Sequence, residues 1–111
     1  MWIFTDTGFV SAVCHFDDPT QLVVRARDRR SLEGLAESAD VEIRGEGTDY
    51  PFRVFVSKDQ FAAWLMHAVE TLDYPNYKGQ AMYTLPDYFQ PVLHDVHHRL
   101  WEMGEAVRNA R

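Results

Sequence analysis

Cysteine is almost absent from this sequence, since Cys14 is the only one among 111 residues. One cysteine cannot form a disulfide within the chain, so nothing requires an oxidising compartment, and we expect Cys14 to be a buried small apolar residue. Long apolar runs are also missing. No window approaches the ~18 uninterrupted apolar residues of a membrane span, and the first residues do not resemble a signal peptide. We therefore expect a cytoplasmic protein that is neither exported nor embedded in a membrane.

Basic residues are in short supply as well. Eleven Lys and Arg stand against 17 Asp and Glu, which gives a formal net charge of −6. This charge disfavours non-specific attraction to nucleic acid phosphates and to anionic lipids. The sequence also has no nucleotide-binding glycine loop, serine elbow or paired-carboxylate signature. We expect an acidic, non-catalytic protein with no cofactor, whose partner is a protein and neither nucleic acid nor membrane.

The chain does have many aromatic and β-branched residues, and its length and its hydrophobic fraction of 46% predict one domain over residues 1–111. A hairpin is expected first, because Asp6-Thr7-Gly8 is good turn chemistry between two strand-like segments. Further strands are expected later in the chain, with a glycine-rich hairpin loop over residues 45–49. The segments expected as strands are Met1–Phe4, Phe9–Phe16, Leu22–Arg27, Val41–Arg44 and Tyr50–Val56.

Helices are expected mainly in the second half of the chain. A short helix should follow Asp28 or Ser31, and a capping box at Ser57 should begin a longer one. Tyr74–Pro86 is expected to be an ordered loop, and a last helix should run over about 88–109. Strands first and helices later predict an α+β fold. We expect a largely antiparallel sheet of about five strands, partly ferredoxin-like, with two main helices and one short helix packed on one face.

Several segments resemble a family of small uncharacterised proteins from actinobacteria and their phages. The likeness covers Met1–Ser11, Leu22–Arg27, Asp49–Val56 and Leu72–Lys78. It implies a compact, stand-alone cytoplasmic protein and brings no functional residues with it. The resemblance also suggests a phage-related modulator of a host or defence protein. The chain beyond Gly79 lies outside the likeness.

The last expected helix has two distinct faces. One is an apolar seam with alternating spacings of four and three, typical of a core helix or of a coiled pair. The seam consists of Phe89, Leu93, Val96, Leu100, Met103 and Val107. On the far side lies an outer face of His94, His98, Trp101 and Glu105, with Arg108 at its rim. A large aromatic on a polar face needs cover from the chain or from a partner. We expect a protein interface here, and a homodimer through two such helices is an open alternative.

Two further sites are alternatives to the interface. His94 and His98 at i and i+4 can reach one metal ion, with Glu102 or Glu105 as an oxygen ligand, as in a small metal-dependent hydrolase. No third ligand is fixed by the sequence, so we expect solvated histidines and no metal.

The other alternative is a basic cluster. It places four arginines within six residues, where they could bind a phosphate or a carboxylate-rich partner, or nucleic acid. Arginines that alternate along an exposed strand also serve solubility alone, and Asp28 interrupts the run. The cluster consists of Arg25, Arg27, Arg29 and Arg30.

Overall fold

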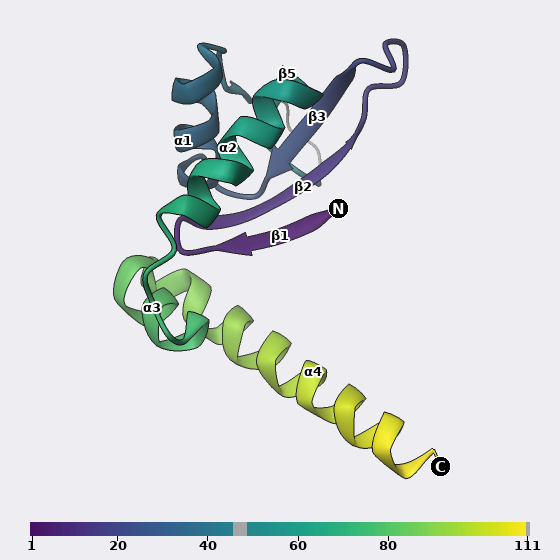
Figure 1. The fold of residues 1–111 in the computed structure, drawn as a ribbon, viewed down its shortest axis with the longest axis vertical. Helices are drawn as coiled ribbons and strands as arrows, with labels where there is room; N and C mark the ends of the chain where they lie inside the picture. Colours follow the sequence, from purple (N-terminus) through teal and green to yellow (C-terminus); the bar gives the residue numbers. More distant parts are fainter. Residues whose placement is uncertain (46–48, 111) are drawn as a thin grey trace.

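The computed structural model describes residues 1–45 and 49–110, and the expected loop over residues 45–49 lies largely outside them. The described residues form a five-stranded antiparallel sheet in the order β1-β2-β3-β5-β4, with four α-helices (Figure 1). The expected α+β class is confirmed. The strands are β1 (Trp2–Thr5), β2 (Gly8–Cys14), β3 (Gln21–Ala26), β4 (Arg44–Gly45) and β5 (Phe52–Ser57). The helices are α1 (Arg30–Ala39), α2 (Lys58–Glu70), α3 (Tyr77–Thr84) and α4 (Gln90–Asn109), with a short 3-10 turn, η1 (Asp87–Phe89), before the last.

The first hairpin forms where the turn chemistry predicted it. Thr5 pairs with Gly8, so only two residues connect β1 to β2. Gly8 has a φ of +149°, which side chains rarely tolerate, and a Cβ there would lie 2.0 Å from Ser31 Oγ. Ser31 Oγ in turn accepts a hydrogen bond from the Phe9 backbone N–H at 3.1 Å. The glycine thus allows the start of α1 to close over the hairpin.

The middle of the chain is the partial ferredoxin-like unit that the order of elements predicted. β3 is followed by α1 and then by β4, and β5 lies between β3 and β4 with both pairings antiparallel. This is a split β-α-β arrangement. β4 itself comprises only two residues, whereas the sequence predicted a strand over Val41–Arg44.

α1 and α2 cover one face of the sheet, and the core lies beneath them (Figure 1). α2 begins at the expected capping box, in which Ser57 Oγ accepts from the Gln60 backbone N–H and the Gln60 side chain accepts from the Ser57 backbone N–H. The core residues alternate along the strands and recur at helical spacing in α1 and α2. They are Val10, Ala12, Val24, Ala26, Leu32, Leu35, Ala36, Val54, Val56, Phe61 and Trp64.

Cys14 is exposed, so its expected burial is wrong. By alternation it shares the sheet face of Val10 and Ala12, but it stands at the end of β2, past the residues that form the core.

The loop expected over Tyr74–Pro86 is wrong in its centre, where α3 forms. Asn76 caps this helix, because its Oδ1 accepts from the Gly79 backbone N–H at 3.0 Å. Two side chains then fasten α3 to the first hairpin: Tyr77 Oη donates to Thr5 O at 2.9 Å and Thr84 Oγ1 donates to Asp6 O at 2.7 Å. α3 is therefore the joint between the sheet and the last helix.

α4 departs from expectation in its position. It begins at Gln90, with Pro91 in its first turn as predicted, but it runs away from the sheet instead of packing on it (Figure 1). All 20 of its residues are described and none is buried. The expectation that this helix packs beside the others is wrong, because α3 and η1 direct the chain away from the covered face before α4 begins. Among the described residues, no helix has both the length and the apolar character needed to cross a bilayer.

Candidate interaction surfaces on and around the last helix

The outer face of α4 is open to solvent. Trp101 is 59% exposed, and the sequence left this point undecided. Its ring stacks on His98, with ring centres 6.2 Å apart and planes at 16°. His98 Nε2 lies 2.9 Å from Glu102 Oε1, and Arg108 Nη1 donates to Glu105 Oε1 at 2.5 Å. The outer face thus has an aromatic centre and a charged rim, and its side chains contact one another through ring stacking and ion pairs.

The described residues of the outer face do not form a complete set of metal ligands. In the part of the chain that the structure describes, no group of three or more His, Cys, Asp and Glu side chains is placed to hold a metal ion. His94 and His98 share the helix face as predicted, and Glu102 contacts His98. A hydrolase site needs at least three protein ligands with one open position. The described residues around these histidines therefore lack the arrangement that the hydrolase alternative requires.

The arginine cluster is divided among separate contacts. Arg25 and Arg27 lie over the Tyr50 ring, with guanidinium carbons 4.5 and 4.4 Å from its centre. Arg25 also donates to Ser11 Oγ at 3.0 Å, and Arg27 donates to Asp49 Oδ1 at 3.0 Å. The hydrogen bond from Arg27 lowers the pKa of Asp49. Tyr50 is therefore a buried ring in contact with two arginines, which the alternation of β3 alone did not reveal.

The remaining two arginines belong to another part of the surface. Arg30 Nη2 donates to the Thr84 carbonyl at 2.6 Å and so ties the start of α1 to the end of α3. Arg29 is exposed. Between them and the Tyr50 pair, Asp28 Oδ2 accepts from Tyr88 Oη at 2.6 Å, a bond that raises the pKa of Tyr88. The guanidinium groups of Arg25, Arg27 and Arg30 are thus engaged in contacts with different parts of the chain.

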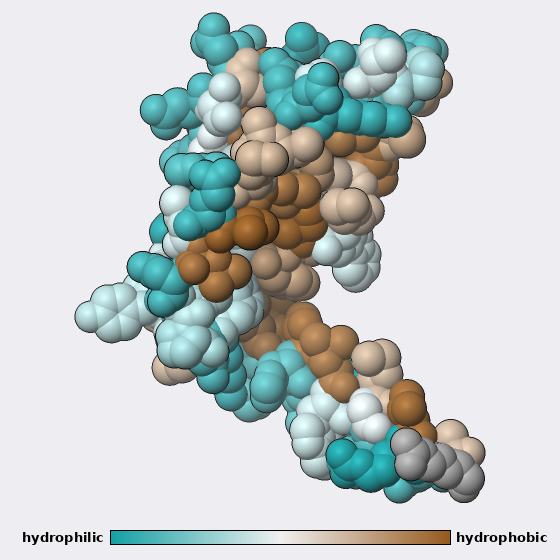
Figure 2. Space-filling view, in the orientation of Figure 1, coloured by the Kyte–Doolittle hydropathy of each residue, from teal (hydrophilic) through white to brown (hydrophobic). Residues whose placement is uncertain are grey.

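An apolar hollow that the sequence analysis did not predict lies between α4 and the uncovered face of the sheet. We call it the α4 groove. It consists of two adjoining cavities of about 580 and 500 Å³ that share Phe4, Val96 and Leu100. Figure 2 shows apolar surface on both sides of this hollow and along α4 beyond it. A search for periodicity within single elements cannot find such a groove, because its walls come from opposite ends of the chain.

An aromatic wall forms the sheet side of the α4 groove. Phe9 makes an edge contact with Trp2 at 5.9 Å between ring centres and packs against Phe4 at 4.6 Å. All three rings line the larger cavity, facing Val92, Val96 and Leu100 of α4.

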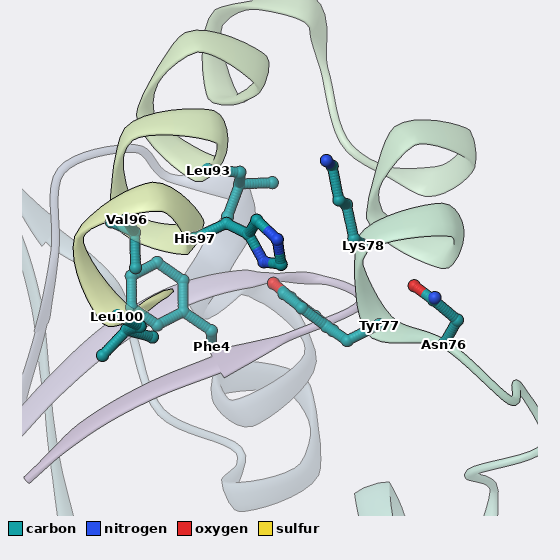
Figure 3. Close-up of a pocket in the computed structure, with 8 residues that line it drawn as sticks. All are labelled: Phe4, Asn76, Tyr77, Lys78, Leu93, Val96, His97 and Leu100. Atoms are coloured by element: carbon teal, nitrogen blue, oxygen red, sulfur yellow. The ribbon is translucent and has the colours of Figure 1, made fainter. Parts of the chain in front are cut away.

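The smaller cavity has a polar end, where His97 of α4 and Tyr77 of α3 point toward one another beside Lys78 (Figure 3). The seam of α4 therefore faces a hollow that the described residues leave open.

The comparisons with known proteins give no family for this chain: no protein-family model, no curated protein and no solved structure matches it.

Proposed function

We propose that this protein is a non-catalytic protein-interaction module in which α4 is the contact helix. One observation carries the proposal: a 20-residue helix projects from the domain with none of its residues buried, while Trp101, Leu100, Met103 and Val107 are all exposed. Most helices gain their stability by packing an apolar face, so an amphipathic helix without such packing is suited to a partner. Exposed apolar patches of this kind typically mark interaction sites.

The outer face has the composition of a contact surface. Trp101 is its anchor, since exposed tryptophans dominate the energetics of many interfaces. His94 and His98 are the adaptable polar contacts around it, and Glu105 with Arg108 forms the rim. That the partner is a host or defence protein of a phage rests on the resemblance of the sequence alone.

Trp101→Ala tests the outer face. Because Trp101 packs against no core residue, the free energy of unfolding should change by less than about 0.5 kcal/mol. Affinity capture from a native host lysate should recover partners with the parent protein and lose them with Trp101→Ala. The matched control is Tyr83→Ala, which removes a 93% exposed aromatic from α3 instead of α4.

Two results would contradict this role. Unfolding of the domain by Trp101→Ala would show that the ring is structural. Capture of the same proteins by Trp101→Ala, Tyr83→Ala and the parent would show that the outer face does not contribute to binding.

A further inference from the structure

The apolar seam of α4 changes character along its length. Phe89, Leu93 and Val96 are half-buried beside the α4 groove, whereas Leu100, Met103 and Val107 are 57%, 59% and 67% exposed. The spacing of four, three, four, three and four continues without a break across this change. Such a seam fits a second helix laid lengthwise against it. The described residues cover the first half of the seam only in part and leave its second half open, and a second copy of this chain can supply a covering helix.

We propose that this protein forms a two-fold symmetric dimer, in which α4 of a second copy lies antiparallel against the seam with its C-terminal half inside the α4 groove. The proposal rests on the role of α4 as the contact helix and names a partner for its apolar seam. One antiparallel register matches every seam residue with an apolar residue of the second copy. It pairs Leu93 with Met103, Val96 with Leu100 and Phe89 with Val107, each pair occurring twice.

The area of the seam shows why the groove belongs to the interface. A 20-residue helix is about 30 Å long and about 10 Å across, so half of its surface is roughly 500 Å². Stable complexes bury about 800 Å² on each partner. Contact between the two seams alone would therefore bury less area than a stable complex needs. The seam also spans fewer than three heptads, which is short for a coiled coil. A helix inside the groove additionally contacts the rings of Trp2, Phe4 and Phe9, which line it.

The shape of the molecule selects the antiparallel direction. The groove adjoins the N-terminal half of α4, and the half beyond Leu100 stands clear of the domain (Figures 1 and 2). Only the free C-terminal half of α4 of a second copy can enter this groove, because the N-terminal half of that helix lies next to α3 and the sheet of its own copy. An antiparallel pair lets each copy insert its free half into the groove of the other. A parallel pair would leave both grooves empty.

The charges along one edge of the pair are complementary. Next to the seam, this edge of α4 carries Arg99, with Asp95 and Glu102 beside it. Arg99 already donates to Glu102 of its own helix at 3.0 Å. In the antiparallel register, the two Arg99 side chains meet near the two-fold axis, and each lies within reach of Asp95 and Glu102 of the other copy. Two cations are thereby set among four carboxylates. On the opposite edge, His97 faces His97 of the second copy.

Molar mass in solution is the first test. Light scattering during size-exclusion chromatography of the full chain should give twice the mass of one chain at high concentration. Met103→Glu with Val107→Glu places four carboxylates in the two grooves and should restore the monomer mass. Both positions are more than half exposed in the single chain, so the far-ultraviolet circular dichroism should not change. A monomer mass for the parent protein at every concentration would overturn the proposal.

Disulfide trapping tests the register. In a Cys14→Ser background, His97→Cys should form an oxidised dimer, since the two copies of residue 97 face each other across the axis. His98→Cys is the matched control, because it points to the outer face and should stay monomeric. Leu93→Cys should also stay monomeric in the antiparallel pair, whereas in a parallel pair it would cross-link. Efficient trapping through residue 93 or 98 but not 97 would overturn the arrangement.

The two proposals on α4 fail in different ways. A parent protein that is monomeric but loses its captured partners on Trp101→Ala would overturn the dimer and support the outer face. A dimer abolished by Met103→Glu with Val107→Glu, together with capture insensitive to Trp101→Ala, would support the dimer and contradict the role of the outer face.

Discussion

The half of the molecule built from the sheet, α1 and α2 differs from α4 in how each is stabilised. In the first, the side chains of Val24, Leu32 and Leu35 are wholly buried, and both helices contact the strands. In α4, the apolar residues are just as regularly spaced, yet none is buried. The periodicity of the two regions is alike, so periodicity alone does not decide whether a helix face becomes core. This difference is the reason why we propose that the apolar face of α4 is used between molecules.

The same substitution in each region gives the largest expected contrast. Leu35→Ala removes a fully buried side chain and should lower the free energy of unfolding by about 2–5 kcal/mol. Leu100→Ala removes one that is 57% exposed and should cost less than about 0.5 kcal/mol at concentrations that keep the chain monomeric. Denaturant titrations of both variants measure the difference. Equal losses would mean that α4 belongs to the same packed core.

The glycines of the two regions should respond in opposite directions. Gly8→Ala forces a Cβ to within 2.0 Å of Ser31 Oγ at a backbone angle that only glycine readily adopts. We expect a loss of about 1–3 kcal/mol, seen as a lower midpoint in denaturant. Gly104→Ala meets nothing within 4 Å in the middle of a helix. It should increase stability by about 0.5–1 kcal/mol and raise the helical signal.

Either glycine result could contradict the structure. A neutral Gly8→Ala would mean that the first hairpin and the start of α1 are not in close contact. A destabilising Gly104→Ala would mean that α4 is not helical at this point.

Local chemistry in the sequence was enough to predict most of the first region. The turn at Asp6-Thr7-Gly8, the strand alternation through Val24 and the capping box at Ser57 each specify structure through neighbouring residues. α3 was missed because Tyr77–Thr84 has little apolar periodicity and a glycine in its first turn. Its signal was Asn76 as an N-cap, which a search for apolar stripes does not weigh. What fixes α3 is contact with Thr5 and Asp6, more than 70 residues away.

The candidate site was predictable only where it lies within one helix. The outer face and the seam follow from the spacing of residues, and the structure places both on α4, except for Phe89, which ends η1. The groove depends on the angle between α4 and the α3–η1 segment before it, and the contact of Arg25 and Arg27 with the Tyr50 ring depends on the segment that precedes β5. Neither can be read from the spacing of residues along one element, because each joins residues that are distant in sequence.

An effect smaller than that of Gly8→Ala is expected at the joint between the two regions, where Tyr77 of α3 donates to the Thr5 carbonyl at 2.9 Å. Burial raises the pKa of Tyr77 to about 12, from 10.0. Because the folded state holds this proton more tightly than the unfolded state, the contribution to stability is complete below pH 10 and is lost as the pH rises towards 12. Tyr77→Phe removes the hydrogen bond. It should lower the free energy of unfolding by about 0.5–1.5 kcal/mol at neutral pH and should weaken the alkaline loss of stability.

Tyr83→Phe, which alters a 93% exposed ring, is the control and should leave the stability at neutral pH and its alkaline loss unchanged. Denaturant titrations from pH 8 to 12 distinguish the variants, and an alkaline profile of Tyr77→Phe that matches the parent would show that α3 is not held to the sheet through this hydroxyl.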